Sequence, residues 1–326
     1  MEQSQQSPST WTITDGNAGN LRQARTLADA LHRPAIDWNL LARAPWRWAA
    51  PHRLPWAANA WGDAFARALN HPPTLAIGCG RQAALATRVL RERGAFAVQI
   101  LDPRMSPRHW DLVIAPEHDQ LGGDNVIRML GSLHPVDDDW LDSARRSFGA
   151  LVSLPQPRTA LLLGGPSAHA QLQPGWADGL AARLQRVVAA QGGCLMVTTS
   201  RRTPADVRTR LREQLAGTIG VFWGGVQDGA NPYPGILARA DRIVCTADSV
   251  NMLSEACATT VPVFVAGLDV LAGRPRQFVD SLLGLGRVRG FDDTLASFAV
   301  TPLRETARVA RQVSERLDRQ AARTTS

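Results

Sequence analysis

The chain has 326 residues, 44% of them hydrophobic, and a formal net charge of +7 at pH 7. This length allows a large core and favours two domains. Because no apolar run approaches the roughly 18 residues of a membrane-spanning helix, a protein that spans a membrane with helices is excluded. All 36 basic residues are arginine, which excludes chemistry that depends on a lysine Schiff base or on the lysine of a phosphate-binding P-loop.

Short apolar runs alternate with helical patterns through the first half of the chain, which indicates a parallel sheet with crossover helices. Segments 20–31 and 81–93 have apolar faces of helical period, and 57–69 has a similar pattern although it contains Gly62. The predicted strands are 11–14, 35–40, 74–77, 96–101, 112–115 and 125–129, and a further helix is predicted at 139–148.

The proline-rich segment 153–157 has the composition of a linker, and the same alternation starts again after it. Strands are predicted at 159–163, 194–198, 219–223, 242–245 and 262–265, and helices at 176–190, 204–215, 234–240 and 249–258. The charged tail 303–323 is predicted to be a helix that is either a solvated face or a brace against the first domain. We therefore expect an α/β protein with two Rossmann-like, doubly wound domains facing across a cleft. The predicted ranges are 1–155, 156–300 and the tail 301–326.

In the first half, three polar loops follow predicted strands, where active-site residues of an open parallel sheet are usually found. The loop Asp15-Gly-Asn-Ala-Gly19 permits close backbone approach to a ligand, with Asp15 placed as a base. Arg81 could bind an anion or a hydroxylated acceptor. In Glu117-His-Asp119, His118 could take a proton from an acceptor hydroxyl while a neighbouring carboxylate orients its ring. Ordinary turns with surface side chains are the alternative for all three loops.

In the second half, hydroxyl and guanidinium groups gather in loops that follow strands. Gly164-Gly-Pro-Ser167 follows one strand, and Thr198-Thr-Ser-Arg-Arg-Thr203 follows the next. Arginine forks aimed at a pyrophosphate would stabilise the charge that grows on a leaving nucleoside diphosphate. A solvated basic turn is the alternative interpretation.

The segment 241–257 is the most informative: a buried strand, the turn at Asp248-Ser249 and a helix that carries Glu255. Ser249 is a favoured N-cap, and a helix start attracts phosphate. The Glu255 carboxylate is expected to face the ligand crevice and accept hydrogen bonds from ribose hydroxyls. The turn-rich loop 227–234 could hold Asn231 or Tyr233 at the same crevice, or be purely structural.

Five of the ten tryptophans lie between Trp38 and Trp61, interleaved with arginines. Such a patch is typical of a protein that contacts anionic lipid at a membrane surface, and a packed core is the rival interpretation. The four cysteines have no C-x-x-C spacing, and the histidines show no zinc-type spacing. We therefore expect reduced, buried thiols in a cytoplasmic protein, with no metal and no bound cofactor. We also expect no nucleic-acid partner, because the basic charge alternates with acidic residues.

Taken together, these segments resemble the mitochondrial fission family named for elongated mitochondria (Elm), whose bacterial members look like GT-B glycosyltransferases. One departure is Asn20, where the family pattern usually has histidine, and this weakens a base role for the first loop. The resemblance covers most of the chain and consists of Asp15-Gly-x-Ala-Gly19 with Gln23, Gly80-Arg81, Asp102-Pro103, Pro116-Glu-His-Asp119 with Asn125-Val-Ile127, Gly164-Gly-Pro-Ser167, Thr199-Ser-Arg-Arg-Thr203, Asn231-Pro-Tyr233 and Thr246-x-Asp-Ser-x-x-Met-x-Ser-Glu-Ala256.

The resemblance implies a bacterial GT-B-like glycosyltransferase that uses a nucleotide-sugar and a cell-envelope acceptor of lipid-linked or lipopolysaccharide type at the inner membrane. A non-catalytic adaptor on the same scaffold is the alternative, and an epimerase that uses a tyrosine–lysine pair is disfavoured without lysine. The catalytic candidates are His118, Asp119 and Asp15, and the acceptor-side candidates are Gly19, Arg81 and Glu117. The nucleotide-sugar candidates are Gly164, Gly165, Ser200, Arg201, Arg202, Thr203, Asn231, Asp248, Ser249, Met252 and Glu255.

Overall fold

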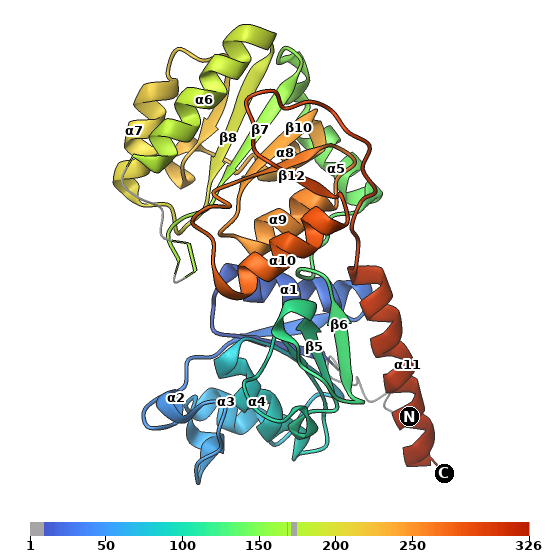
Figure 1. Cartoon of the computed structure of the whole chain (residues 1–326). Helices are drawn as coiled ribbons and strands as arrows, with labels where there is room; N and C mark the ends of the chain where they lie inside the picture. The colour runs from blue at the N-terminus through green and yellow to red at the C-terminus, as the bar shows by residue number, and fades with distance from the viewer. Residues whose placement is uncertain (1–9, 168, 171–174, 326) are drawn as a thin grey trace. The chain divides into compact units, whose positions relative to one another are not determined.

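The computed structural model describes residues 10–167, 169–170 and 175–325, and the chain divides into two compact units (Figure 1). Unit 1 comprises Met1–His134 and Glu305–Ser326, and unit 2 comprises Pro135–Arg304. Helix α5 (Asp138–Ser147) and the 3-10 helix η4 (Gly149–Ser153), which the sequence-based ranges assigned to the N-terminal domain, therefore belong to unit 2.

Unit 1 is built on a six-stranded parallel sheet in the order β2-β1-β3-β4-β5-β6. Strands β1, β3, β4 and β5 are buried along their whole length, as expected for parallel strands covered on both faces. The strands are β1 (Thr10–Thr14), β2 (Ala35–Asn39), β3 (Leu75–Cys79), β4 (Phe96–Ile100), β5 (Leu112–Pro116) and β6 (Val126–Met129).

Helices cover both faces of this sheet. One core cluster joins α1 (Ala18–Ala30) and the C-terminal helix α11 (Thr306–Thr325) to the strands, and α11 contributes the buried residues Val309, Ala310 and Val313. The other cluster joins α3 (Asp63–Ala68) and α4 (Arg81–Arg91) to the sheet. The tail helix therefore packs into the core of unit 1 and is not a fully solvated segment.

The helix predicted at 57–69 is divided in the structure, so this prediction was wrong in detail. It consists of the 3-10 helix η1 (Ala57–Asn59) and α3, separated by Gly62 at a φ of +86°. An α-helix requires a negative φ, so the glycine ends one segment and lets the other begin. The short helix α2 (Trp46–Ala49) precedes them.

Unit 2 contains a second six-stranded parallel sheet, in the order β12-β11-β10-β7-β8-β9. Its strands are β7 (Arg158–Leu163), β8 (Cys194–Thr199), β9 (Gly220–Trp223), β10 (Arg242–Thr246), β11 (Val263–Ala266) and β12 (Val288–Gly290). Besides α5, its helices are α6 (Trp176–Gln191), α7 (Ala205–Leu215), α8 (Tyr233–Arg239), α9 (Val250–Cys257) and α10 (Gly273–Gly284). The sequence patterns did not predict α10 and β12.

Each sheet has one point where the strand order reverses, and this is where open α/β sheets bind ligands. In unit 1 the reversal lies between β1 and β3, and in unit 2 between β7 and β10. The predicted loops after these four strands thus lie in pairs at the carboxyl edges of the two sheets.

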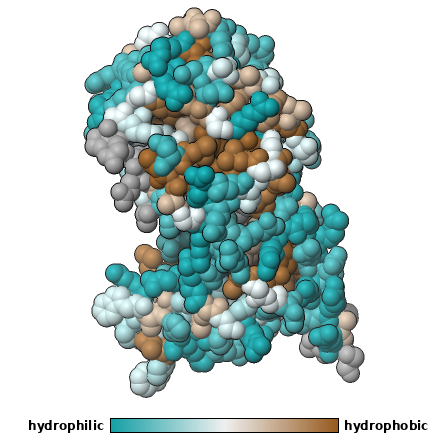
Figure 2. All heavy atoms as spheres, in the orientation of Figure 1, coloured by the Kyte–Doolittle hydropathy of each residue, from teal (hydrophilic) through white to brown (hydrophobic). Residues whose placement is uncertain are grey.

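Hydrophilic side chains prevail on the face drawn in Figure 2. Among the residues described, no helix is long and apolar enough to cross a membrane.

Candidate functional site

At the reversal point of unit 2, the turn after β7 is hydrogen-bonded to the turn after β10. The Gly164 N–H donates to the Thr246 hydroxyl at 2.8 Å, and the Gly165 N–H donates to the Asp248 carboxylate at 2.9 Å. The Thr246 hydroxyl in turn donates to Asp248. The two glycine amides therefore fix the turn, so they are not available as donors to a ligand.

Both glycines are required by close packing. A Cβ atom at Gly164 would lie 2.1 Å from Oδ2 of Asp248, and one at Gly165 would lie 2.4 Å from the backbone carbonyl carbon of Arg202. Real Cβ atoms do not approach other atoms so closely. The absence of a side chain at these two positions thus brings three loops together at the edge of the sheet.

Asp248 is the centre of this loop cluster. Its side chain is only 1% exposed and forms an ion pair of 2.7 Å with Nη2 of Arg202, whose own side chain is 42% exposed. Arg202 also donates from Nη1 to the Gly165 carbonyl oxygen at 3.2 Å. A buried carboxylate therefore holds a half-exposed guanidinium in a fixed place beside the turn, with solvent-facing donor capacity left for an anion.

The loop after β8 is held by hydrogen bonds of its backbone and of its hydroxyl groups. The Ser200 N–H donates to the Leu163 carbonyl oxygen at 2.8 Å, and the Thr203 hydroxyl donates to the Gly164 carbonyl oxygen. The Arg202 N–H donates to the Ser200 hydroxyl at 3.2 Å. Arg201 is exposed. The structure thus brings the predicted residues Gly164, Gly165, Ser200, Arg202, Thr203 and Asp248 into one cluster.

Helix α9 begins beside this cluster, as predicted. Ser249 is its N-cap, and the Ser249 side chain accepts a hydrogen bond from the Met252 N–H. The amides of the first turn, at Val250 and Asn251, have no carbonyl partner within the helix, which makes this end attractive to an anion. Ser249 and Met252 are both half-buried.

Glu255 does not have the accessible carboxylate that the sequence predicted. The residue is 2% exposed and accepts a hydrogen bond from the hydroxyl of Tyr233, itself 6% exposed. The physical reason is that residues 253–257 of α9 are all buried and that Tyr233, the first residue of α8, contacts the carboxylate. Asn231, which is exposed, accepts a hydrogen bond from the Tyr233 N–H at 3.0 Å and so helps to start α8.

A cavity of about 320 Å³ adjoins the glycine turn of unit 2. Its walls include Gly164, Gly165 and Thr203 from the cluster and the N-terminal parts of α6 and α7. Arg210 of α7 pairs there with Asp178 of α6 at 3.2 Å and with Asp206 at 2.8 Å. This volume is at the lower end of the range for small-ligand sites. The sequence patterns did not point to Arg210, Asp178 or Asp206, because they lie inside helices at ordinary surface spacing.

The reversal point of unit 1 is linked by an amide side chain instead of an ion pair. Asn20 donates to the Asp15 carboxylate at 3.0 Å, and a Cβ atom at Gly80 would lie 2.6 Å from the Asn20 side-chain nitrogen. The Gly19 N–H donates to the Asn17 side chain, which caps α1. Asn20 thus connects the loops after β1 and β3 at the position where the family pattern has histidine.

The other predicted residues of unit 1 lie along the same edge of the sheet. Arg81, at the start of α4, donates to the Ala50 carbonyl oxygen at 3.1 Å and thereby supports the segment that follows α2. Glu117, His118 and Asp119 form the 3-10 helix η3 directly after β5, with Glu117 exposed and the other two half-buried. Since β4 lies between β3 and β5, this group is two strands away from Arg81 along the edge.

The tryptophan-rich segment divides into two groups. Trp38 and Trp61 pack on Phe65 with ring centroids 5.1 and 5.2 Å apart, so the core interpretation holds for them. Trp48 and Trp56 are 70% and 79% exposed. The predicted membrane-surface patch therefore depends on Trp48 and Trp56.

The four cysteines are free and buried, as the sequence predicted. Burial raises the pKa of the Cys257 thiol to about 12 and raises the pKa of Cys245 well above its usual value, so neither is a nucleophile near neutral pH. Within the described part of the chain, no group of three or more histidine, cysteine or acidic side chains is arranged to hold a metal ion.

Two Rossmann-like units, each with a polar loop cluster at the reversal point of a six-stranded parallel sheet, define the GT-B fold class. MurG from Acinetobacter baumannii is 13% identical with a TM-score of 0.52 over 97% of this chain and 94% of that one. A UDP-GlcNAc 2-epimerase from Methanocaldococcus jannaschii, solved in complex with UDP-GlcNAc and UDP, is 10% identical with a TM-score of 0.53 over 94% of this chain and 99% of that one.

Within this class, the chain belongs to the family described as mitochondrial fission ELM1, whose model matches residues 18–317. The mitochondrial fission protein ELM1 of Arabidopsis thaliana is 32% identical over 276 residues. These residues cover 75% of this chain and 64% of the plant protein, so the chain spans less than two thirds of that relative's length. The family resemblance and the fold class predicted from the sequence are both confirmed.

Proposed function

We propose that the protein transfers a sugar from a nucleotide-sugar donor to a cell-envelope acceptor. The observation that carries the proposal is the guanidinium of Arg202, held by buried Asp248 beside the start of α9 at the reversal point of unit 2. A diphosphate placed there would meet a fixed positive charge and the first amides of a helix. The solved structure of the epimerase in complex with UDP-GlcNAc and UDP supports a nucleotide-sugar as the ligand of such a fold.

The chemistry follows from this charge distribution. As the bond between the sugar's anomeric carbon and the diphosphate oxygen breaks, negative charge grows on the leaving diphosphate, and Arg202 with exposed Arg201 would stabilise it. The acceptor oxygen forms the new bond to the anomeric carbon and gives its proton to a base. His118, Asp119 and Asp15 are our candidates for that base, with Glu117, Arg81 and Gly19 on the acceptor side, and the proposal includes neither a metal nor a cofactor.

Calorimetric titration with UDP, GDP, ADP and CMP tests the donor site. Arg202→Ala should weaken binding of the preferred diphosphate by about tenfold or more, because it removes a charge-assisted contact to phosphate. Arg276→Ala is the matched control, since Arg276 pairs with Asp280 on the exposed face of α10. Equal affinity of wild type and Arg202→Ala for every nucleotide would contradict the assignment of the diphosphate site.

Glu255 requires a separate test, because its carboxylate is buried under Tyr233. Tyr233→Phe removes the hydroxyl that Glu255 accepts from and leaves the ring in place. If Glu255 binds ribose after a rearrangement of α8, Glu255→Gln should weaken nucleotide binding while Tyr233→Phe should preserve or strengthen it. Glu255→Gln with unchanged affinity would make Glu255 a structural residue.

We infer a lipid-linked acceptor at the inner face of the membrane from exposed Trp48 and Trp56, which lie among arginines of the same segment. The double variant Trp48→Ser/Trp56→Ser should lose co-sedimentation with anionic vesicles. Val226→Ser/Leu285→Ser is the control, since these residues of unit 2 are 88% and 67% exposed. Equal sedimentation of all three proteins, or indifference to lipid charge, would remove the membrane contact from the proposal.

A non-catalytic adaptor is the second candidate. It is favoured by the family's description and by the internal hydrogen bonds that already satisfy the Gly164 and Gly165 amides and the Glu255 carboxylate. The variant His118→Ala/Asp119→Ala distinguishes the two candidates. A transferase should lose turnover of the nucleotide-sugar and any cellular phenotype that depends on it, whereas an adaptor should keep the phenotype.

A further inference from the structure

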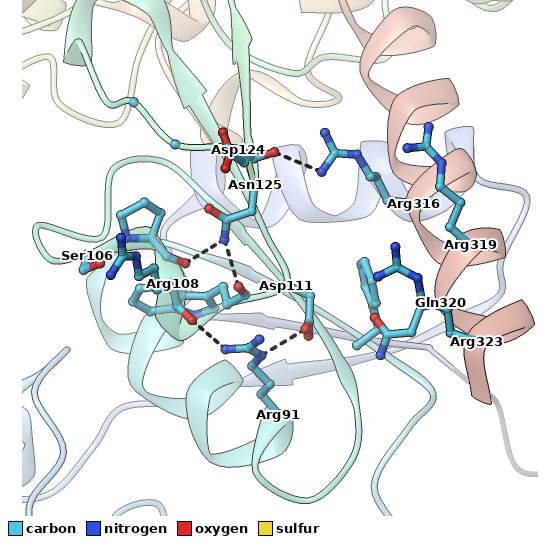
Figure 3. Close-up of a pocket in the computed structure, with 15 residues that line it drawn as sticks. Arg91, Ser106, Arg108, Asp111, Asp124, Asn125, Arg316, Arg319, Gln320 and Arg323 are labelled. Atoms are coloured by element: carbon cyan, nitrogen blue, oxygen red, sulfur yellow. Dashed lines mark hydrogen bonds and ion pairs between the residues drawn. The ribbon is translucent and has the colours of Figure 1, made fainter.

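A large basic groove lies within unit 1, away from the carboxyl edge of the sheet. Its volume is about 950 Å³, and its walls are the C-terminal half of α11, the end of α4 and the loops that precede β5 and β6 (Figure 3). These loops mark the amino ends of the strands, opposite to the edge that carries Asp15 and His118. The proposed transferase therefore gives this groove no role.

The walls of the groove are fixed by hydrogen bonds. The side-chain nitrogen of Asn125 donates to the carbonyl oxygens of Pro107 and Trp110, both at 2.9 Å. Trp110 is 1% exposed and donates from its indole nitrogen to the Thr87 hydroxyl at 2.8 Å. Asn125, which the family resemblance marked without assigning it a role, thus holds two loops in one shape.

Arginine dominates the lining. The groove contains Arg91, Arg108, Arg316, Arg319 and Arg323 against only two carboxylates, Asp111 and Asp124, which leaves an excess of three positive charges. Asp111 is already paired with Arg91 at 3.0 Å. Burial and then the nearby arginines, including Arg91, lower the pKa of adjacent His109, as expected in a positive field.

The arrangement of α11 brings three of these arginines together on one side of the helix. Val309 and Val313 are fully buried and hold the helix against the core, while Arg316, Arg319 and Arg323 follow at spacings of three and four residues. Like charges at such spacings destabilise a helix. The helix dipole favours a cation in the last turn, which accounts for Arg323, but Arg316 lies more than two turns before the end.

The arginines retain capacity for a ligand. Arg316 extends from α11 and donates from Nη1 to the Asp124 carbonyl oxygen at 3.0 Å, which leaves its other guanidinium hydrogens unused by that contact (Figure 3). Arg319 pairs with Glu315 at 3.5 Å, where both side chains are more than half exposed, so solvent screens this pair strongly.

We propose that this groove binds a soluble ligand that carries two or more clustered phosphate groups. Several guanidinium forks match several phosphate oxygens, and the volume exceeds what a single phosphate needs. A membrane lipid is the other source of clustered phosphates. Among the described residues, none of the strongly exposed large hydrophobic side chains lines the groove, so the groove itself offers little exposed apolar surface for acyl chains.

Inorganic tripolyphosphate is the probe, and calorimetry is performed in an Arg202→Ala background to remove the proposed diphosphate site. The double variant Arg316→Gln/Arg323→Gln should weaken tripolyphosphate binding by about tenfold or more. Arg67→Gln/Arg311→Gln is the charge-matched control, because both residues belong to unit 1 and lie outside the groove. Circular dichroism checks that every variant is folded.

Tripolyphosphate binding that survives in the groove variant, or that falls equally in the control variant, would overturn the proposal. Co-sedimentation with phosphatidylcholine vesicles that contain a phosphoinositide forms the second arm. Vesicle binding that the groove variant loses, together with no binding of free tripolyphosphate, would assign the groove to a lipid surface and overturn the soluble ligand. Both arms are independent of nucleotide binding at unit 2, so failure of the transferase proposal leaves them unaffected.

Discussion

The reversal points of the two sheets are built alike but linked by different chemistry. In unit 2 the buried carboxylate of Asp248 connects the turns after β7 and β10 and holds Arg202. In unit 1 the neutral side chain of Asn20 connects the loops after β1 and β3. Arg202 keeps its ion pair with Asp248 and still has donors that face solvent, whereas the amide of Asn20 supplies no charge. We therefore propose that the reversal point of unit 2, and not that of unit 1, binds the anionic diphosphate.

Among substitutions at the reversal points of the two sheets, Gly165→Ala should have the largest effect on stability. The new Cβ atom would meet backbone atoms of Arg202 and Thr203, which cannot rotate away, so we expect a loss of about 3 kcal/mol in the free energy of unfolding. The measurement is urea unfolding followed by circular dichroism.

Gly179→Ala is the control for this change. Gly179 lies in α6, and a Cβ atom added there would have no other atom within 4 Å, so alanine should raise the free energy of unfolding by about 0.8 kcal/mol. If Gly165→Ala were as well tolerated as Gly179→Ala, close packing would not be what joins the three loops of unit 2.

Asp248→Asn should have the next largest effect. The substitution keeps the shape of the side chain but removes the negative charge that holds Arg202 and strengthens the hydrogen bond from the Gly165 N–H. It should therefore reduce the free energy of unfolding by about 2 kcal/mol. In unit 1, Asn20→Ala removes a neutral hydrogen bond and should cost about 1 kcal/mol. Nucleotide binding should fall with Asp248→Asn and not with Asn20→Ala, and the reverse order would contradict the division of roles.

The sequence predicted the fold well because buried parallel strands leave a strong local signal. The apolar runs of β3, β4, β7 and β10 are bounded by polar turns, so each strand could be identified alone. Helix α10 was missed because it begins at Gly273 after Ala272, which provides no side-chain cap. Strand β12 has only three residues, too few for any periodic pattern.

The site was predicted as a set of loops but not as a set of contacts. The Gly165 N–H and Asp248 are 83 positions apart, and no local pattern reveals that the amide is used to fix the turn. Burial of Glu255 depends on Tyr233, 22 residues earlier, which the sequence placed at a loop with no defined partner. Thr246 is part of the family motif but was not predicted as a site residue. Its position two residues before Asp248 was the signal that could have identified it as a hydrogen-bond partner of that carboxylate.

The smallest effect concerns a carboxylate near the surface of unit 1. Asp37, on β2, has a lowered pKa mainly because it accepts a hydrogen bond from Arg25, with a further contribution from the Thr12 hydroxyl. The unfolded chain then binds more protons than the folded one in acid, so Asp37 stabilises the fold above its usual pKa of about 3.9, and this contribution is lost as the pH falls through the lowered value.

Since the Arg25 side chain is 55% exposed, solvent screening should limit the contribution to under about 1 kcal/mol. Urea unfolding at a series of pH values should therefore show wild type more stable than Asp37→Asn at neutral pH, with the difference shrinking below about pH 4. A difference that stays constant down to the most acidic conditions would mean that packing at β2, and not the charge of Asp37, explains the effect. The ion pair of Asp37 with Arg25 would then contribute no electrostatic stabilisation, in contrast to the buried pair of Asp248 with Arg202.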